Sequence, residues 1–284
     1  MKPARAVAGH VARKRFGQHF LSDRSVLAAI VAAVDPREGQ TIVEIGPGLG
    51  ALTAALLERV PQLHAVEIDR DLAARLRTRW PQQRLQLHEV DALRFDFRTV
   101  AAADGGSLRL VGNLPYNISS PLLVHLLAFR EYVDDQHFML QKEVVDRIAA
   151  APGSGDHGRL SVLMQAFYEV EALFDVPPTA FEPPPKVASS VVRMMVRADR
   201  AGVDAGPLQR LLAAGFAQRR KMIRRTLLPW LAARAVPADD LDPTLRPEDI
   251  DVSTWIDLAA RLDAVERAGG QSGPADPSAG TPVV

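Results

Sequence analysis

The amino-acid sequence predicts an α/β protein in which a mainly parallel sheet is followed by a small helical domain. Short apolar, β-branched runs alternate with helical patterns, as in right-handed βαβ crossovers. A glycine-rich turn follows the first of these runs, and basic segments flank the alternation on both sides. The predicted strands are residues 41–45, 64–68, 85–90, 108–111 and 136–140.

Helices are expected before the first strand and between the others. The first helix, residues 25–34, has Ser22 or Asp23 available as its N-cap. A turn at 152–158 is followed by two β-rich runs, 170–175 and 189–196. The remaining predicted helices of this region are residues 52–60, 71–80, 121–129 and 143–150.

The last third of the chain predicts a separate helical domain. Residues 199–207 mix Gly, Pro, Asp and Ala and predict a linker, whereas 208–235 and 252–267 have helical patterns. The rest is rich in Gly and Pro and predicts a disordered tail. The expected organisation is therefore a basic segment at 1–24, an α/β domain at 25–200, a helical domain at 205–267 and a tail at 268–284.

Composition excludes several classes of protein. With 47% hydrophobic and 24% charged residues, the 284-residue chain matches globular proteins rather than disordered ones. It has no cysteine, which excludes disulfides, a thiol nucleophile and Cys-ligated metals. We expect no membrane-spanning segment, because no apolar run approaches the roughly 18 residues required. The first residues contain no apolar core of a secretion signal, and we expect a cytoplasmic protein.

The formal net charge of zero hides an uneven distribution. Residues 1–24 carry six cations and one acid, and 201–236 carry seven cations and one acid. Residues 237–284 carry ten acids and three cations. Two basic segments on a neutral chain indicate a surface that binds a polyanion. Each run alone is equally typical of a solvated helix face.

The glycine turn predicts a cofactor site. Gly46, Gly48 and Gly50 allow the backbone to approach a ligand closely, where a Cβ would collide. Glu67, at the end of the second strand, is placed to accept hydrogen bonds from ribose hydroxyls. Asp91, after the third strand, is placed to accept from an adenine amine, and Glu44 precedes the loop. This pattern predicts an adenosine-containing cofactor, with both NAD and S-adenosylmethionine open.

The tetrapeptide Asn113-Leu-Pro-Tyr116, directly after the fourth strand, favours the second cofactor. It resembles the signature of methyltransferases that modify an exocyclic amine of a base. Such an amine is a poor nucleophile because its lone pair is delocalised into the ring. The side-chain oxygen of Asn113 and the carbonyl of Leu114 can accept from its two hydrogens and favour a localised lone pair. Tyr116 can stack on the base.

Several longer segments along roughly residues 10–265 resemble one family. They are 13–21 (RKRFGQHFL), 44–50 (EIGPGLG), 113–119 (NLPYNIS), 137–143 (HFMLQKE), 181–187 (FEPPPKV) and 218–221 (QRRK). Together they resemble the small-subunit ribosomal RNA adenine dimethyltransferases. The resemblance implies a Rossmann-like S-adenosylmethionine-dependent methyltransferase domain with a small C-terminal helical domain. It also implies N6,N6-dimethylation of two adjacent adenosines in a hairpin loop near the 3′ end of 16S rRNA.

The resemblance further implies which residues form the site. Cofactor contacts are expected from His19, Leu21, Gly46, Gly48, Glu67, Asp91 and Asn113. The catalytic group would be Asn113, Leu114, Tyr116 and Phe181, with the two rings stacking on opposite faces of the adenine. RNA would be held by Arg219, Arg220, Lys221, Arg224 and Arg225. Many relatives carry Asn where this chain has His19. We expect a monomer without metal that acts on the small ribosomal subunit during its biogenesis.

Three other functions remain as alternatives. The first is another adenine methyltransferase, acting on large-subunit RNA or on DNA, although DNA enzymes more often carry Asp-Pro-Pro-Tyr. The second is a non-catalytic RNA-binding or ribosome-assembly factor with the same fold. The third is an NAD-dependent oxidoreductase, but the chain has no obvious Tyr-x-x-x-Lys pair. Hydride transfer would also leave Asn113 and Tyr116 unexplained.

Overall fold

The computed structural model describes residues 6–7, 10–11, 18–200 and 204–270. The chain divides into two compact units. The first contains the chain up to Asp146 together with Glu169–Val196. The second contains Arg147–Tyr168 and the chain from Arg197 onward. Most of the expected basic segment at 1–24 lies outside the described residues.

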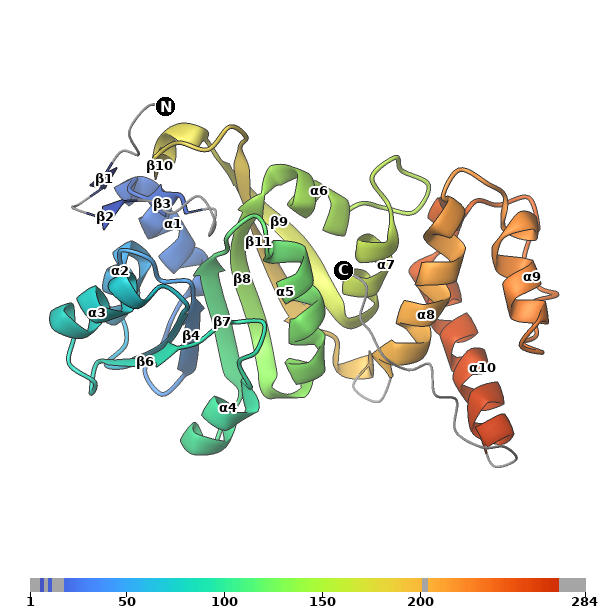
Figure 1. Cartoon of the computed structure of the whole chain (residues 1–284), viewed down its shortest axis with the longest axis horizontal. Helices are drawn as coiled ribbons and strands as arrows, with labels where there is room; N and C mark the ends of the chain where they lie inside the picture. The colour runs from blue at the N-terminus through green and yellow to red at the C-terminus, as the bar shows by residue number, and fades with distance from the viewer. Residues whose placement is uncertain (1–5, 8–9, 12–17, 201–203, 271–284) are drawn as a thin grey trace. The chain divides into compact units, whose positions relative to one another are not determined.

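The first unit is built on a seven-stranded sheet. Five of its strands are parallel, and β11 pairs antiparallel with β8. Figure 1 shows β4, β7 and β8 side by side at the centre of this unit. In spatial order the strands are β6 (Leu85–Glu89), β5 (Leu63–Glu67), β4 (Thr41–Ile45), β7 (Leu108–Asn113), β8 (Val133–Gln141), β11 (Ser189–Val196) and β9 (Tyr168–Val176).

This strand order creates a topological switch point between β4 and β7. From β4 the chain builds outward through β5 and β6, then returns to place β7 on the other side of β4. The carboxyl ends of β4 and β7 are adjacent, since Glu44 pairs with Val111. In sheets of this kind ligands bind outside the carboxyl ends of the strands at the switch point. Both the glycine turn and the Asn113–Tyr116 tetrapeptide follow strands that end there.

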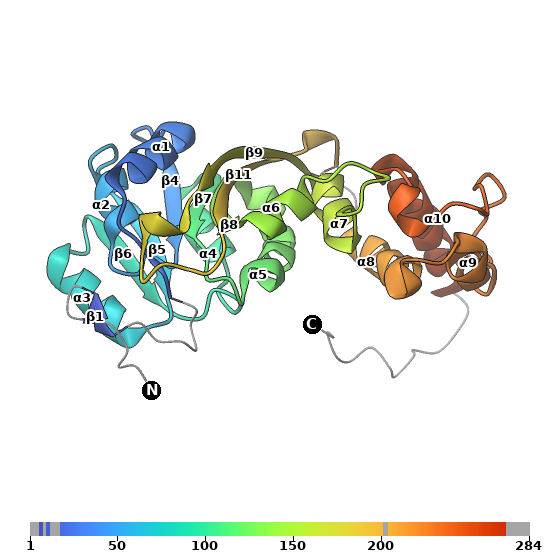
Figure 2. The same ribbon diagram turned by 90° about the horizontal axis from the view of Figure 1, so that it is seen from above.

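Helices cover both faces of the sheet, and Figure 2 shows α1 and α5 on opposite sides of it. The side chain of Asp23 caps α1 by accepting from the backbone N–H groups of Ser25 and Val26. Buried apolar residues of α1 and α2 pack with Ile42 of β4 in one hydrophobic core. The helices of this region are α1 (Arg24–Val34), α2 (Ala51–Leu57), α3 (Arg70–Arg79), α4 (Arg98–Asp104), α5 (Ser119–Leu126) and α6 (Lys142–Ile148).

Two short strand pairs accompany the main sheet. β1 (Ala6–Val7) pairs antiparallel with β2 (His10–Val11). β3 (Phe20–Leu21) pairs antiparallel with β10 (Phe181–Glu182). The second pair joins residues from the expected N-terminal segment to the FEPPPKV motif, so these two distant segments lie side by side.

The second unit is helical. Its centre is Trp255, fully buried, whose ring lies so close to Gly215 that a Cβ there would come within 2.5 Å of it. The ring also stacks on Phe216, with centroids 5.6 Å apart. The helices are α7 (Arg159–Phe167), α8 (Ala205–Gly215), α9 (Leu227–Ala232) and α10 (Val252–Gly270).

The structure corrects the expectation of one helical stretch over residues 208–235. Helix α8 ends at Gly215, two short 3-10 turns follow at 216–218 and 223–225, and α9 begins only at Leu227. Pro229 lies in the first turn of α9, where a missing N–H costs little, and its ring excludes a helix that continues unbroken through residue 225. The basic residues 219–225 therefore lie on a turn and not on a helix.

The division into units has one boundary after Val196, close to the expected one near residue 200, but it also assigns residues 147–168 to the second unit. Helix α7 packs against α8 and α10, which places residues 147–168 with the C-terminal helices. The sequence patterns did not predict α7, because most of its residues are buried and it lacks a clear polar face. Helix α10 extends to Gly270, three residues into the segment expected as tail, and the rest of that segment lies outside the described residues.

Candidate active site

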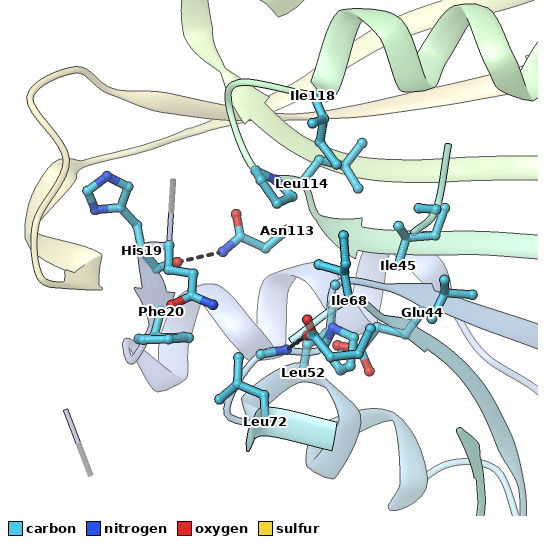
Figure 3. A pocket seen from close by; sticks show the side chains of 18 of the residues that line it. His19, Phe20, Glu44, Ile45, Leu52, Ile68, Leu72, Asn113, Leu114 and Ile118 are labelled. Carbon is cyan, nitrogen blue, oxygen red and sulfur yellow. Dashed lines mark hydrogen bonds between the residues drawn. The ribbon is translucent and has the colours of Figure 1, made fainter. Parts of the chain in front are cut away.

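A cavity of about 300 Å³ opens at the carboxyl edge of the sheet, at the switch point between β4 and β7. Figure 3 shows its walls, with Phe20 and Leu72 on one side and Ile118 on another. Apolar side chains form most of the lining, and polar groups enter from the ends of the strands. The expected site residues that line it are His19, Leu21, Gly46, Gly48, Glu67, Asp91, Asn113, Leu114 and Tyr116.

The glycine turn forms the floor of this cavity. Gly48 has a φ of +59°, and a Cβ on it would stand 3.2 Å from the ring of Phe20. Gly46 has a φ of +70°, which residues with a Cβ rarely adopt, and it lies in contact distance of the Asn113 carbonyl and the Pro115 ring. Glycine is therefore required where the first strand's turn meets both the N-terminal segment and the turn after β7.

Glu67 presents a fixed carboxylate to the cavity. Its Oε1 accepts from the backbone N–H of Asp69 at 2.8 Å, and its Oε2 accepts from that of Gly48 at 3.2 Å. Burial raises the pKa of Glu67, against the effect of these backbone donors. Asp91, at the next strand end, accepts from the N–H of Leu93 at 3.0 Å. Carboxylate oxygens at two strand ends, beside apolar walls, fit the hydroxyls and amine of an adenosine group.

Glu44 is a second acid of the cavity and is 2% exposed. The Thr53 hydroxyl donates to its Oε2 at 2.6 Å. Burial raises the pKa of Glu44 to about 7, with a further contribution from the nearby Glu67 carboxylate. Glu44 therefore titrates near neutral pH in the folded protein.

The side-chain amide of Asn113 has a defined orientation. Its Nδ2 donates to the backbone carbonyl of His19 at 3.0 Å, drawn as a dashed line in Figure 3. Only the nitrogen of an amide can donate to a carbonyl, so Oδ1 is left as an acceptor. Leu114 is buried, its N–H donates to Met139, and its carbonyl precedes Pro115, which has no N–H. Asn113 and Leu114 both line the cavity, and their role as acceptors for an amine stays a prediction.

Tyr116 lines the cavity, and both its hydroxyl and its ring contact other side chains. The hydroxyl shares a 2.8 Å hydrogen bond with Oγ of Ser189. The imidazole of His19 stacks on the ring, with centroids 5.6 Å apart and planes inclined by 29°. Burial raises the pKa of the Tyr116 phenol, which keeps it neutral at physiological pH.

The structure does not bring Phe181 to the cavity. Its side chain is 3% exposed and belongs to the hydrophobic core that includes Leu21 and Val34. The cause is the pairing of β10 with β3, in which Phe181 lies opposite Leu21. The expected stacking partner of Tyr116 is thus replaced in this conformation by His19, whose Nδ1 is 2.8 Å from the Pro183 carbonyl.

The expected RNA-binding residues all lie in the second unit, on the turn at 219–225, which we name the basic turn. Arg219 differs from the others because its guanidinium pairs with Glu248 at 2.7 Å and donates to the Gly155 carbonyl. In the described part of the chain no ion pair joins the other four to an acid, and all four are exposed: Arg220, Lys221, Arg224 and Arg225.

Three further residues of the site were not expected from the sequence. Phe20 packs on Gly48, Ile68 lines the cavity with 46% of its surface exposed, and Ser189 holds Tyr116. The sequence offered a signal for Ile68, because it directly follows Glu67 at a strand end. It offered none for Ser189, because the contact of Ser189 with Tyr116 depends on the fold. Among the described residues, no cluster of His, Asp and Glu could hold a metal ion. No described helix has the length and hydropathy to cross a membrane.

Comparison with known proteins gives consistent results. The family model of ribosomal RNA adenine dimethylase matches residues 9–260. The chain is 56% identical over 258 residues to the Ribosomal RNA small subunit methyltransferase A of Methylibium petroleiphilum, which covers 91% of this chain and 99% of that protein. It is 55% identical over 268 residues to the protein of the same name from Bordetella pertussis, covering 93% and 98%.

Two solved structures support the fold. A dimethyladenosine transferase from Plasmodium falciparum has a TM-score of 0.73 at 23% identity, covering 87% of this chain and 98% of that one. The 23S rRNA methyltransferase ErmE has a TM-score of 0.59 at 26% identity, covering 86% and 99%. The Rossmann-like methyltransferase fold with added C-terminal helices is thereby confirmed, as is the enzyme class predicted from the motifs. By its sequence, fold and relatives, this chain belongs to the ribosomal RNA adenine dimethylase family.

Proposed function

We propose that this enzyme transfers methyl groups from S-adenosylmethionine to N6 of two adjacent adenosines in a hairpin loop near the 3′ end of 16S rRNA. The observation that carries the proposal is the fixed amide of Asn113 at the cavity, with Oδ1 free to accept. The names of the relatives, small subunit methyltransferase A, support the choice of substrate. The enzyme acts as a cytoplasmic monomer on the small subunit during its assembly.

The cofactor is held by residues at the ends of β4, β5 and β6, by Asn113 at the end of β7 and by the N-terminal segment. Glu67 accepts the ribose hydroxyls, and its carboxylate is already oriented by two backbone donors. Asp91 accepts from the adenine amine, while Gly46 and Gly48 admit the ligand close to the backbone. His19 and Leu21 close over it from the other side of the cavity. Bound S-adenosylmethionine supplies a methyl group on a positively charged sulfonium, which makes that methyl electrophilic.

The target amine is activated by positioning. In the first transfer Asn113 Oδ1 and the Leu114 carbonyl would accept the two hydrogens of the amine and localise the nitrogen lone pair; in the second transfer one hydrogen remains, and one of these two acceptors would hold it. Tyr116 stacks on the base and holds it in line, a contact worth about 1–3 kcal/mol. Phe181 is left out of this group because its ring is committed to the core. The carbon–sulfur bond would break as the carbon–nitrogen bond forms, and the methylated nitrogen, an acidic cation, would release its proton to water, so alignment is needed more than a strong base.

The rRNA is held through its phosphates by the second unit. The four unpaired cations of the basic turn, Arg220, Lys221, Arg224 and Arg225, provide contacts that are independent of sequence and sensitive to salt. Arg219 contributes indirectly, because its bonds to Glu248 and Gly155 hold the turn against the loop at 151–158. Selection of the two adenosines then depends on the shape of the RNA and on extrusion of the bases.

The test is methyl transfer from labelled S-adenosylmethionine to unmethylated small subunits, with product nucleosides identified by mass spectrometry. We expect dimethyladenosine at two adjacent positions near the 3′ end. Asn113→Ala should reduce transfer by at least about 100-fold while the fold stays intact, as measured by circular dichroism. Methylation of large-subunit RNA alone, or tight subunit binding without transfer, would overturn the proposal.

A further inference from the structure

Tyr116 is anchored at its far end by a residue that the proposed reaction does not use. Its hydroxyl and Oγ of Ser189 lie 2.8 Å apart. Ser189 is fully buried and is the first residue of β11, where it pairs with Gln141 at the end of β8. An anchor in a paired strand has little freedom to move. The hydrogen bond therefore connects the Tyr116 ring to a paired strand of the sheet.

The other end of Tyr116 is less constrained. The residue belongs to the turn between β7 and α5, and its backbone carbonyl accepts from the Ser119 hydroxyl at 3.1 Å. A tyrosine side chain rotates about two bonds, so the backbone alone does not set the plane of its ring. The plane of the ring is therefore set by contacts of the ring itself. The hydroxyl is the group farthest from the backbone, so a hydrogen bond to it restricts the ring most.

The same segment of the chain supports the ring a second time. His19 stacks on Tyr116, and its Nδ1 lies 2.8 Å from the Pro183 carbonyl. Pro183 and Ser189 border one short stretch between β10 and β11. This stretch thus acts on Tyr116 both directly, through Ser189, and by way of the His19 ring.

We propose that Ser189 is a positioning residue for methyl transfer: its hydroxyl fixes the ring plane of Tyr116, and thereby the target adenine, for in-line attack. The proposal rests on the proposed function, in which Tyr116 stacks on the base. Ser189 touches neither cofactor nor base in this assignment and acts only through the tyrosine hydroxyl. A small misalignment of the base lowers the rate steeply, because positioning supplies most of the catalysis.

The chain offers a matched control in the next residue. Ser190 is 2% exposed and lies in the same strand, but its hydroxyl donates to the Phe174 carbonyl and not to Tyr116. Ser189→Ala and Ser190→Ala thus remove the same group from equally buried sites of one strand. A general loss of packing affects both variants, whereas loss of positioning affects only the first.

The experiment measures kcat and KM for methylation of small subunits by wild type, Ser189→Ala, Tyr116→Phe, their double variant and Ser190→Ala. We expect Ser189→Ala to lower kcat by about 3- to 10-fold, the rate equivalent of one hydrogen bond. KM for S-adenosylmethionine should stay unchanged. Tyr116→Phe should show a similar loss, and the double variant no further loss, because the two changes remove the same bond. Ser190→Ala should keep the wild-type kcat.

A binding measurement separates positioning from folding. An RNA hairpin with 2-aminopurine at the target position should be less quenched by Ser189→Ala than by wild type or Ser190→Ala. Equal kcat and equal quenching in the two serine variants would overturn the proposal, as would full additivity in the double variant. Should Ser189→Ala fail to fold, a wild-type kcat in Tyr116→Phe would overturn it instead. Absence of transfer by the wild type would refute the proposed function as well.

Discussion

At the scale of single residues, Glu44 carries a buried carboxyl group next to the cofactor cavity. Burial and the nearby Glu67 raise its pKa from 4.5 to about 7, although the Thr53 hydrogen bond opposes the shift. Between these two values the folded protein holds a proton that the unfolded chain has released. The contribution of Glu44 to the free energy of unfolding therefore falls as pH rises through this window, and it is constant above it.

Glu44→Gln should remove that contribution while keeping an acceptor for Thr53. Wild type loses this contribution between pH 5 and 8, and the variant does not. The difference in unfolding free energy, variant minus wild type, should therefore increase by roughly 1–3 kcal/mol over this range, at about 1.4 kcal/mol per pKa unit. Urea unfolding followed by circular dichroism at several pH values measures this. Both proteins should still lose some unfolding free energy as pH rises, because the pKa of Glu67 is also raised. Identical pH profiles for the two proteins would contradict the assignment.

The residues of the site differ in how far the sequence could predict them. Gly46, Glu67 and Asn113 follow strands directly, so the order of strands places them at one edge, and the cavity contains all three. Phe181 could not be placed this way, since the direction of its side chain depends on pairing with a strand far away in sequence. The same holds for Ser189, whose contact with Tyr116 joins two turns that no local pattern relates.

At the scale of elements, Arg109 connects α1 to the centre of the sheet. Its guanidinium on β7 pairs with Asp135 of β8 at 2.8 Å and donates to the Val34 carbonyl, at the end of α1, at 2.6 Å. It also donates to the Gln40 side chain at 2.8 Å. Both charged groups are about nine-tenths buried, so each depends on the other for compensation of its lost hydration.

Arg109→Leu should destabilise the protein by about 3–5 kcal/mol, because it leaves the buried Asp135 carboxylate with only the His137 imidazole, 3.3 Å away, as a partner. Adding Asp135→Leu should recover part of the loss, since no isolated charge then remains. As a control, Arg37→Ala breaks the exposed pair with Asp35 and should change the stability little, because solvent screens that pair. Guanidinium unfolding measures all three. A double variant less stable than Arg109→Leu would show that the carboxylate is not the source of the cost.

Elements were predictable where their hydrophobic period was clear. The run at 41–45 became β4 with the expected ends, because β-branched residues buried on both faces leave little choice. The helical pattern at 208–235 was misleading, since apolar spacing continues across the two short turns that separate α8 from α9. Helix α7 shows the converse case, in which burial on all sides removes the period that identifies a helix.

At the scale of the whole molecule, the sequence reveals the charge runs but not which charges are neutralised. In the second unit Arg210 pairs with Glu266, Arg261 with Asp240 and Arg267 with Asp263. Arg210 belongs to the basic segment 201–236, whereas Arg261 and Arg267 belong to the acidic segment 237–284, which supplies all three acids. The basic turn is different, because four of its five cations have no such ion pair in the described part of the chain. Its charge is therefore available to a polyanion.

The salt dependence of RNA binding separates these two kinds of cation. Arg220→Ala with Lys221→Ala should weaken binding of the small-subunit RNA and reduce the slope of log K against log salt by about 1.5, at roughly 0.7–0.9 per phosphate contact. The matched control, Arg210→Ala with Arg267→Ala, removes the same net charge from exposed sites that already face acids, and it should leave the slope unchanged. Filter binding between about 50 and 200 mM salt measures both. Equal slopes for the two double variants would mean that RNA responds only to net charge and that the basic turn is an ordinary solvated surface.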